Sequence, residues 1–257
     1  MPATPARPTQ NPPRDPALKQ GLALFYGRPP DHAGALRCFR ESAEAGSDEA
    51  LAMLGLCLLE GLGVAADPVR ARELLERAAA RGSRTARFQL GRALISGRGG
   101  PVDERRGLTA YLSAAALGHV EAVFNLACCL QAGVGCLPDR LAAKALFLRA
   151  RTLGCTLKAD VRVRQRELRA VRALARRFED PDRLLFLVQE RQRELAVLHD
   201  LAQSARLPMR QAESASPRRW QGAVRYAVGV LAALAGTVGD RLRLRSPDAG
   251  PTTTLLR

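Results

Sequence analysis

The stretch ALAMLGLCLLEGLGVAADPVRARELLERAAARG, residues 50–82, decides how the rest of the chain is interpreted. In its first third, Ala50, Leu54 and Leu58 have the i, i+4, i+8 spacing that brings side chains onto one face of an α-helix. Alanine and leucine also have high helix propensity. The beginning of this stretch therefore predicts a helix with one buried face.

The middle of the stretch predicts a turn and a second helix. Gly61 and Gly63 allow the positive φ angles that end a helix and redirect the chain. Asp67 is suited to accept hydrogen bonds from the unpaired amides of a new helix, and Pro68 suits its first turn. Gly82 then closes a helix–turn–helix unit.

The same unit recurs along the chain with a period of 36 residues, which is the expected mark of a helical repeat protein. Four independent series of equivalent residues share the period. They are Gly46, Gly82, Gly118 and Gly154; Gly27, Gly63, Gly99 and Gly135; Asp31, Asp67, Asp103 and Asp139; and Phe39, Leu75, Tyr111 and Phe147.

Residues 50–82, 86–118 and 122–154 resemble Sel-one-like repeats, which are relatives of the tetratricopeptide repeats. The resemblance rests on the spaced alanines, the Leu-Gly pair, Gly-x-Gly, the aspartate and Ala-Ala-x-x-Gly. It implies an all-α, right-handed α-solenoid of helix–turn–helix repeats whose concave face holds peptides or partner proteins. The family is not known for catalysis of its own.

Composition and turn signals divide the chain into six parts. The expected parts are a Pro/Arg-rich, disordered N-terminus (1–14), four repeats within 15–155 (15–46, 47–82, 83–118 and 119–154), a basic helical hairpin (156–203), a linker (204–219), a Gly/Ala-rich helix (220–245) and a disordered tail (246–257). The first repeat is degenerate and the fourth is modified, as expected at the ends of a solenoid.

A binding groove is predicted from the positions at which the first helix of each repeat turns away from the second. Counted from the Leu-Gly pair, these positions are Leu56, Arg92 and Cys128, then Leu59, Ile95 and Gln131. Apolar anchors beside an arginine would suit an amphipathic helix or an extended segment with an acidic group. Burial beneath a neighbouring unit is the alternative. The neighbouring Ala52, Phe88 and Phe124 are interpreted as packing residues.

The C-terminal hairpin has two possible roles. A helix is expected over 157–178, with an apolar face and a row of arginines (Arg162, Arg166, Arg169 and Arg176), and Asp180-Pro181 starts a second helix. Covering the apolar end of the solenoid is the preferred role. Binding of an acidic partner or of phosphate by the arginine row is the alternative.

The Gly/Ala-rich segment 220–245 contains an apolar run of 13 residues, from Tyr226 to Val238, with arginines on both sides. Because a span of the bilayer needs about 20 residues, this run is too short for an ordinary transmembrane helix. Docking on the solenoid or on a partner is favoured, and peripheral attachment to an anionic membrane is the alternative.

The charge of the chain raises the question of nucleic acid. The formal charge is 40 − 25 = +15, and aromatic residues make up only 4% of the sequence. Aligned arginines suit phosphate, but base recognition by single-strand binders uses exposed aromatic side chains, which are scarce here. A protein or peptide partner is therefore favoured over nucleic acid.

Catalytic and metal-binding patterns are not found in the sequence. His32, His119 and His199 lie in separate segments, and Cys128-Cys129 lacks zinc-ligand spacing. Cys57 and Cys129 are expected to be small buried residues, and Cys136 an exposed thiol. These features predict a non-enzymatic scaffold or adaptor without a cofactor. The N-terminus lacks an apolar signal, so a cytoplasmic location is expected, with signal-independent secretion left open.

Overall fold

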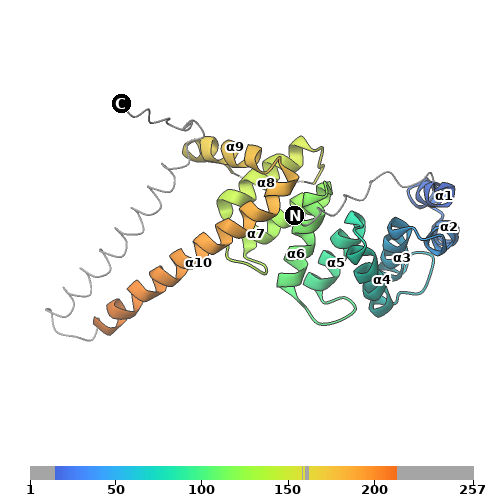
Figure 1. Cartoon of the computed structure of the whole chain (residues 1–257), viewed down its shortest axis with the longest axis horizontal. Coiled ribbons are helices and arrows are strands. Elements are labelled where there is room, and N and C mark those ends of the chain that lie inside the picture. The colour runs from blue at the N-terminus through green and yellow to red at the C-terminus, as the bar shows by residue number, and fades with distance from the viewer. Residues whose placement is uncertain (1–14, 158, 160–161, 213–257) are drawn as a thin grey trace, which may run out of the picture. The chain divides into compact units, whose positions relative to one another are not determined.

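The structure is a computed structural model, and it describes residues 15–157, 159 and 162–212. In these residues every regular element is helical (Figure 1). The elements are α1 (Pro16–Phe25), α2 (His32–Glu44), α3 (Asp48–Glu60), α4 (Pro68–Ala80), α5 (Arg84–Ser96), α6 (Glu104–Ala116), α7 (Val120–Ala132), α8 (Arg140–Thr152), a 3₁₀ turn (Gln165–Glu167), α9 (Leu168–Arg177) and α10 (Pro181–Ala212). The predicted all-α fold is confirmed.

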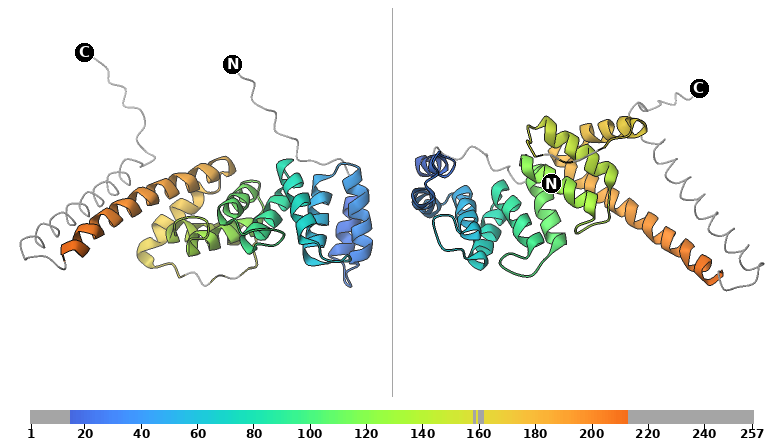
Figure 2. Two further views of the ribbon diagram at one scale, coloured as in Figure 1. Left: turned by 90° about the horizontal axis from the view of Figure 1, so that it is seen from below. Right: turned by 180° about the vertical axis from the view of Figure 1, so that it is seen from behind.

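The first eight helices form four consecutive pairs, and we call the first and second members of a pair helix A and helix B. Each helix packs on its partner and on the next helix in the chain, and α3 also packs on α5. Figure 2 shows the pairs following one another in chain order. Such nearest-neighbour packing is the defining feature of a helical solenoid.

The aspartate series begins every helix B, as predicted. In the second pair, Asp67 Oδ1 accepts the amide of Arg70 at 3.0 Å. The aspartates of the other three pairs do the same for the residue three positions on, and Asp15 caps α1 in this way. Each carboxylate satisfies one of the amides that a helix start leaves unpaired.

The glycine series at the A–B turn has two causes, of which the sequence suggested only one. Gly63 has a φ of 71°, as the turn requires. A β-carbon at this position would also lie 2.6 Å from the carbonyl oxygen of His32, in helix B of the preceding pair. The turn therefore touches the neighbouring repeat so closely that only glycine fits.

The apolar end of the fourth pair is covered by the C-terminal helices. Val171, Leu174 and Phe178 of the α9 region share one buried cluster with residues of α7 and α8. Leu184, Leu187 and Val188, at the start of α10, belong to the same cluster; Leu184 has 0% exposure and the other two have at most 4%.

The predicted helix over 157–178 is wrong in its first half. The helical conformation begins only at Gln165, and α9 itself at Leu168. Glu167 fixes this start, because its carboxylate lies 2.5 Å from Lys144 Nζ and accepts the amide of Arg164. Before it, Leu157, Ala159 and Val163 line a small pocket together with residues of α7 and α8, so packing overrides the helix propensity of these residues.

The predicted linker over 204–219 is wrong for 204–212, because α10 continues to Ala212. Pro208 removes one backbone donor, but alanine, leucine, methionine and arginine flank it and favour helix. Two compact units divide the chain inside α10, after Gln189. The predictions for residues 1–14, 213–219, 220–245 and 246–257 concern parts of the chain outside the described residues.

Candidate protein-binding face

The positions predicted to line a groove are only partly exposed. Leu59 is fully buried, with 0% exposure, in a cluster with Ala71 and Ala93. Its assignment to a binding surface was wrong. The reason is that α5 of the next pair packs directly against α3, so this position of the second pair lies between two repeats.

Leu56 and Ile95 are half-buried, so each side chain packs against the core and also contributes to the surface. Leu56 packs against the core cluster of the first two pairs. Ile95 packs closely against α6, the helix B of its own repeat, since a β-carbon on Gly107 would lie 2.5 Å from Ile95 Cγ1. Substitution of Ile95 by a charged residue would therefore disturb the fold as well as the surface.

Arg92 is half-exposed and held in a network that joins two repeats. Its guanidinium lies 3.1 Å from Glu60 Oε1 and donates to Gln89 Oε1 at 2.8 Å. Arg98 lies 2.8 Å from the same Glu60 oxygen and also donates to the carbonyl of Leu59. Two guanidinium groups and one carboxylate leave one net positive charge here. The sequence did not indicate Glu60 or Arg98 as part of this surface, because the ion pair between them depends on how the repeats stack.

Cys128 and Gln131 are exposed on α7, as predicted for a surface position. We call Leu56, Arg92, Cys128 and Gln131, with Glu60 and Arg98, the A-helix face. It runs over three successive helices A and combines a half-buried leucine, a pre-organised positive charge and an exposed amide. These groups can make apolar contacts, bind a carboxylate and donate or accept hydrogen bonds.

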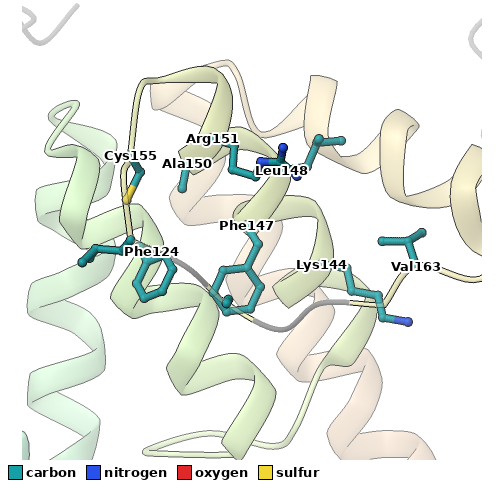
Figure 3. Close-up of a pocket in the computed structure, with 10 residues that line it drawn as sticks. Phe124, Lys144, Phe147, Leu148, Ala150, Arg151, Cys155 and Val163 are labelled. Carbon is teal, nitrogen blue, oxygen red and sulfur yellow. The ribbon is translucent and has the colours of Figure 1, made fainter.

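The aromatic residues beside this face pack inward, in agreement with their interpretation as packing residues. Phe88 stacks on His119 with ring centroids 4.3 Å apart. Phe124 meets Phe147 edge to face at 5.2 Å. Around the latter pair Figure 3 shows Cys155, Lys144 and Val163 at the rim of a small pocket, whose volume is about 100 Å³.

The predicted basic row does not lie on one helix. Arg162 precedes the 3₁₀ turn, Arg166 lies within it, and only Arg169 and Arg176 belong to α9. All four side chains are exposed. Arg172, which the prediction omitted, is also exposed and lies between Arg169 and Arg176 on the same side of α9.

The cysteine thiols are all free. Cys57 and Cys129 are buried, as predicted, and burial raises the pKa of Cys57 to about 11 and that of Cys129 to about 12. Cys136 was predicted to be exposed but is half-buried against the core, and burial raises its pKa to about 11. Thiols with raised pKa values are poor nucleophiles at neutral pH.

Within the described part of the chain, no three histidine, cysteine, aspartate or glutamate side chains gather as a metal site would require. Among the same residues, no helix combines the length and the apolar character needed to cross a membrane.

Comparison with protein families places the repeats in a known group. The model of the Sel1 repeat matches residues 20–47, 48–83, 85–119 and 120–155. The chain belongs to the Sel1 repeat family. The resemblance found in the sequence is thereby confirmed, including the degenerate first repeat. A search of curated proteins found no match.

Two solved structures of repeat proteins are similar to this chain. A protective antigen of uropathogenic Escherichia coli that displays an SLR fold is 23% identical, with a TM-score of 0.55, over 68% of this chain and 40% of its own. This chain thus spans less than half the length of that antigen. A Sel1 repeat protein from Oxalobacter formigenes is 22% identical, with a TM-score of 0.45, over 54% of this chain and 58% of its own. The first of these supports the solenoid fold.

Proposed function

We propose that this chain is a non-catalytic scaffold that binds a segment of a partner protein on the A-helix face. Sel1 repeat proteins generally act in protein–protein interaction. The single observation that carries the more specific proposal is the ion-paired Arg92, held half-exposed between two repeats at the position equivalent to the half-buried Leu56 of the preceding repeat.

The chemistry of this face indicates the kind of segment it binds. Arg92 and Arg98 share one carboxylate, so an acidic side chain from a partner can bind the remaining positive charge without moving either arginine far. Because the guanidinium groups are already positioned, little side-chain freedom is lost on binding. Leu56 supplies apolar contact nearby. A partner segment with a carboxylate next to an apolar residue fits best.

The test is capture from an extract of the native cells with the full chain as bait, followed by quantitative mass spectrometry. The double variant Arg92→Glu, Gln131→Glu should lose the specific partner by at least about tenfold, since it reverses the charge that the partner carboxylate meets. Gln131 is exposed, and the ion pair of the half-exposed Arg92 is worth roughly 0–1 kcal/mol, so the melting temperature should fall by no more than a few degrees.

Arg140→Glu is the matched control. It makes the same charge reversal at an exposed position at the start of α8, where the equivalent residue of α6 is already Glu104. This bait should retain the partner. Equal capture by the wild type and the Arg92 variant would show that binding occurs elsewhere or is unspecific.

A further inference from the structure

A second surface lies on the other side of the repeats, and we call it the outer groove. It runs between α4 and α6, is floored by α5, and has a volume of about 500 Å³. Its floor residues Leu90 and Leu94 lie about 160° around α5 from Arg92, at roughly 100° per residue. The outer groove is therefore distinct from the A-helix face.

The outer groove has small apolar walls and a basic rim. Ala79, Ala80 and Ala110 form much of the walls, so a helix can approach closely. The rim carries Arg87, Arg105 and Arg106 but only one carboxylate, that of Glu76, which lies 3.1 Å from Arg106. Three guanidinium groups and one carboxylate leave a net charge of +2.

The equivalent positions one repeat later are apolar and buried. A shift of 36 residues converts the rim residues Arg87, Arg105, Arg106 and Thr109 into Val123, Leu141, Ala142 and Ala145. The floor leucines Leu90 and Leu94, which are 8% and 1% exposed, become Leu126 and Leu130 with 0% exposure, and Val123, at the position of the half-buried Arg87, is fully buried.

The cluster that buries these residues includes the C-terminal helices as well as α6 and α8. Leu184, Leu187 and Val188, at the i, i+3, i+4 spacing of an amphipathic helix, lie in one cluster with Val123, Leu126 and Leu130. In the fourth repeat, these equivalent positions are thus apolar and lie in a core to which the start of α10 contributes. The outer groove has the same leucine floor, but its rim is polar and can face water when no partner is bound.

From this correspondence we propose that the outer groove binds an amphipathic helix of a partner protein whose polar side is acidic. We infer a helix because the amphipathic start of α10 joins the buried cluster at the equivalent positions, and we infer an acidic polar side because the rim has a net positive charge. The chain's own segment 220–245 does not fit this requirement, because arginines flank it on both sides (Arg218, Arg219 and Arg225 before the apolar run, and Arg241, Arg243 and Arg245 after it).

The probe for the test is a fluorescent peptide copied from residues 181–198, the part of α10 whose apolar residues join the buried cluster of the fourth repeat. The parent peptide has three acidic and three basic residues. In the acidic peptide, Arg183, Arg191 and Arg193 are replaced by glutamate. The full chain should bind the acidic peptide on the order of tenfold more tightly than the parent at about 0.1 M salt, where charges within about 10 Å still interact.

Variants of the full chain locate the binding. Arg87→Glu combined with Arg105→Glu should weaken binding of the acidic peptide at least about tenfold. Arg105→Glu alone, at an exposed position, should give part of this loss and guards against misfolding of the double variant. Arg140→Glu and the pair Arg92→Glu, Gln131→Glu should bind as the wild type does. If the A-helix face proved not to bind a partner, this result would therefore be unchanged.

A photo-crosslinking residue at Thr109, which is exposed on the groove wall, identifies the occupant directly. Crosslinking to the acidic peptide, lost in the Arg87 and Arg105 double variant, supports the proposal. Crosslinks to residues 213–257 of the same chain, or to a second copy, that persist when the peptide is in excess would overturn it. So would equal binding of the parent and acidic peptides.

Discussion

At position 119 the chain carries a histidine where the two preceding repeats begin helix A with serine. Ser47 and Ser83 each accept an amide of their own helix, but His119 makes no such hydrogen bond. Its ring stacks on Phe88 instead, with an interplanar angle of 22°. A helix cap has been exchanged for an aromatic contact between two repeats, and the side chain is largely buried.

Burial gives His119 an effect on the pH dependence of folding. Burial lowers the pKa of His119, while the carboxylate of Glu121, 3.3 Å from Nδ1, raises it by a smaller amount. The unfolded chain takes up this proton near pH 6.5, and the folded chain only at lower pH. The stability due to neutral His119 is therefore complete above about pH 6.5 and decreases as the pH falls below it.

Urea unfolding at several pH values between about 7.5 and 5 checks this expectation. The free energy of unfolding of the wild type should fall more steeply with decreasing pH than that of His119→Ser, in which this group is removed. His199→Ser, at an exposed position of α10, should follow the wild type. A pH profile of His119→Ser parallel to that of the wild type would contradict the assignment.

Among the elements, α9 and α10 show how the end of the array is closed. The α9 helix packs on α8, and Arg149 of α8 is buried beneath its end, where its Nη2 donates weakly to the carbonyl of Glu179 at 3.5 Å. Burial lowers the pKa of Arg149, and Nη1 has no hydrogen-bond partner. A charge would not be enclosed here unless the apolar contacts around it outweighed the cost of removing it from water.

Phe178 is expected to supply much of that apolar contact. It has 0% exposure, so Phe178→Ala should reduce the free energy of unfolding by about 3–5 kcal/mol through lost burial and the cavity that remains. Phe186→Ala removes the same atoms from a side chain that is 58% exposed and should cost less than about 1 kcal/mol. Denaturant unfolding of both variants tests this. Similar losses would mean that α9 does not cover the fourth repeat as described.

For the whole molecule, charge works against compactness more than surface ion pairs support it. Some of the described ion pairs join neighbouring repeats, as Glu76 does with Arg106, and others lie within one repeat, as Asp48 does with Arg81, but one partner or both are at least 40% exposed in these two pairs. Such pairs contribute roughly 0–1 kcal/mol each. A net charge of +15 on a chain of this size adds long-range repulsion.

Sodium chloride should therefore stabilise the protein. An increase from about 20 to about 300 mM shortens the screening length from roughly 20 to roughly 6 Å, which weakens the repulsion among many arginines more than the few close pairs. The melting temperature should rise by a few degrees, measured by circular dichroism at pH 7.5. A fall would show that the ion pairs between repeats dominate. Glu60→Gln, which removes one shared carboxylate, should steepen the rise.

The sequence by itself determined the repeat, its helices and the turns between them. The physical reason is that these features depend on local chemistry, as when Asp67 caps α4 or Gly63 adopts a positive φ. The period of 36 residues then places equivalent side chains at equivalent positions, so the exposure of Arg92, Cys128 and Gln131 could be predicted.

Only the tertiary structure decided which of these positions a neighbour covers. Leu59 is buried because α5 packs across it, and α9 begins only at Leu168, after Leu157, Ala159 and Val163 have lined a pocket with residues of α7 and α8. The pairing of Glu60 with Arg92 and Arg98 also depends on the offset between stacked repeats. Contacts between elements distant in sequence leave no local pattern, so burial, partner choice and the outer groove emerge only when the repeats are stacked.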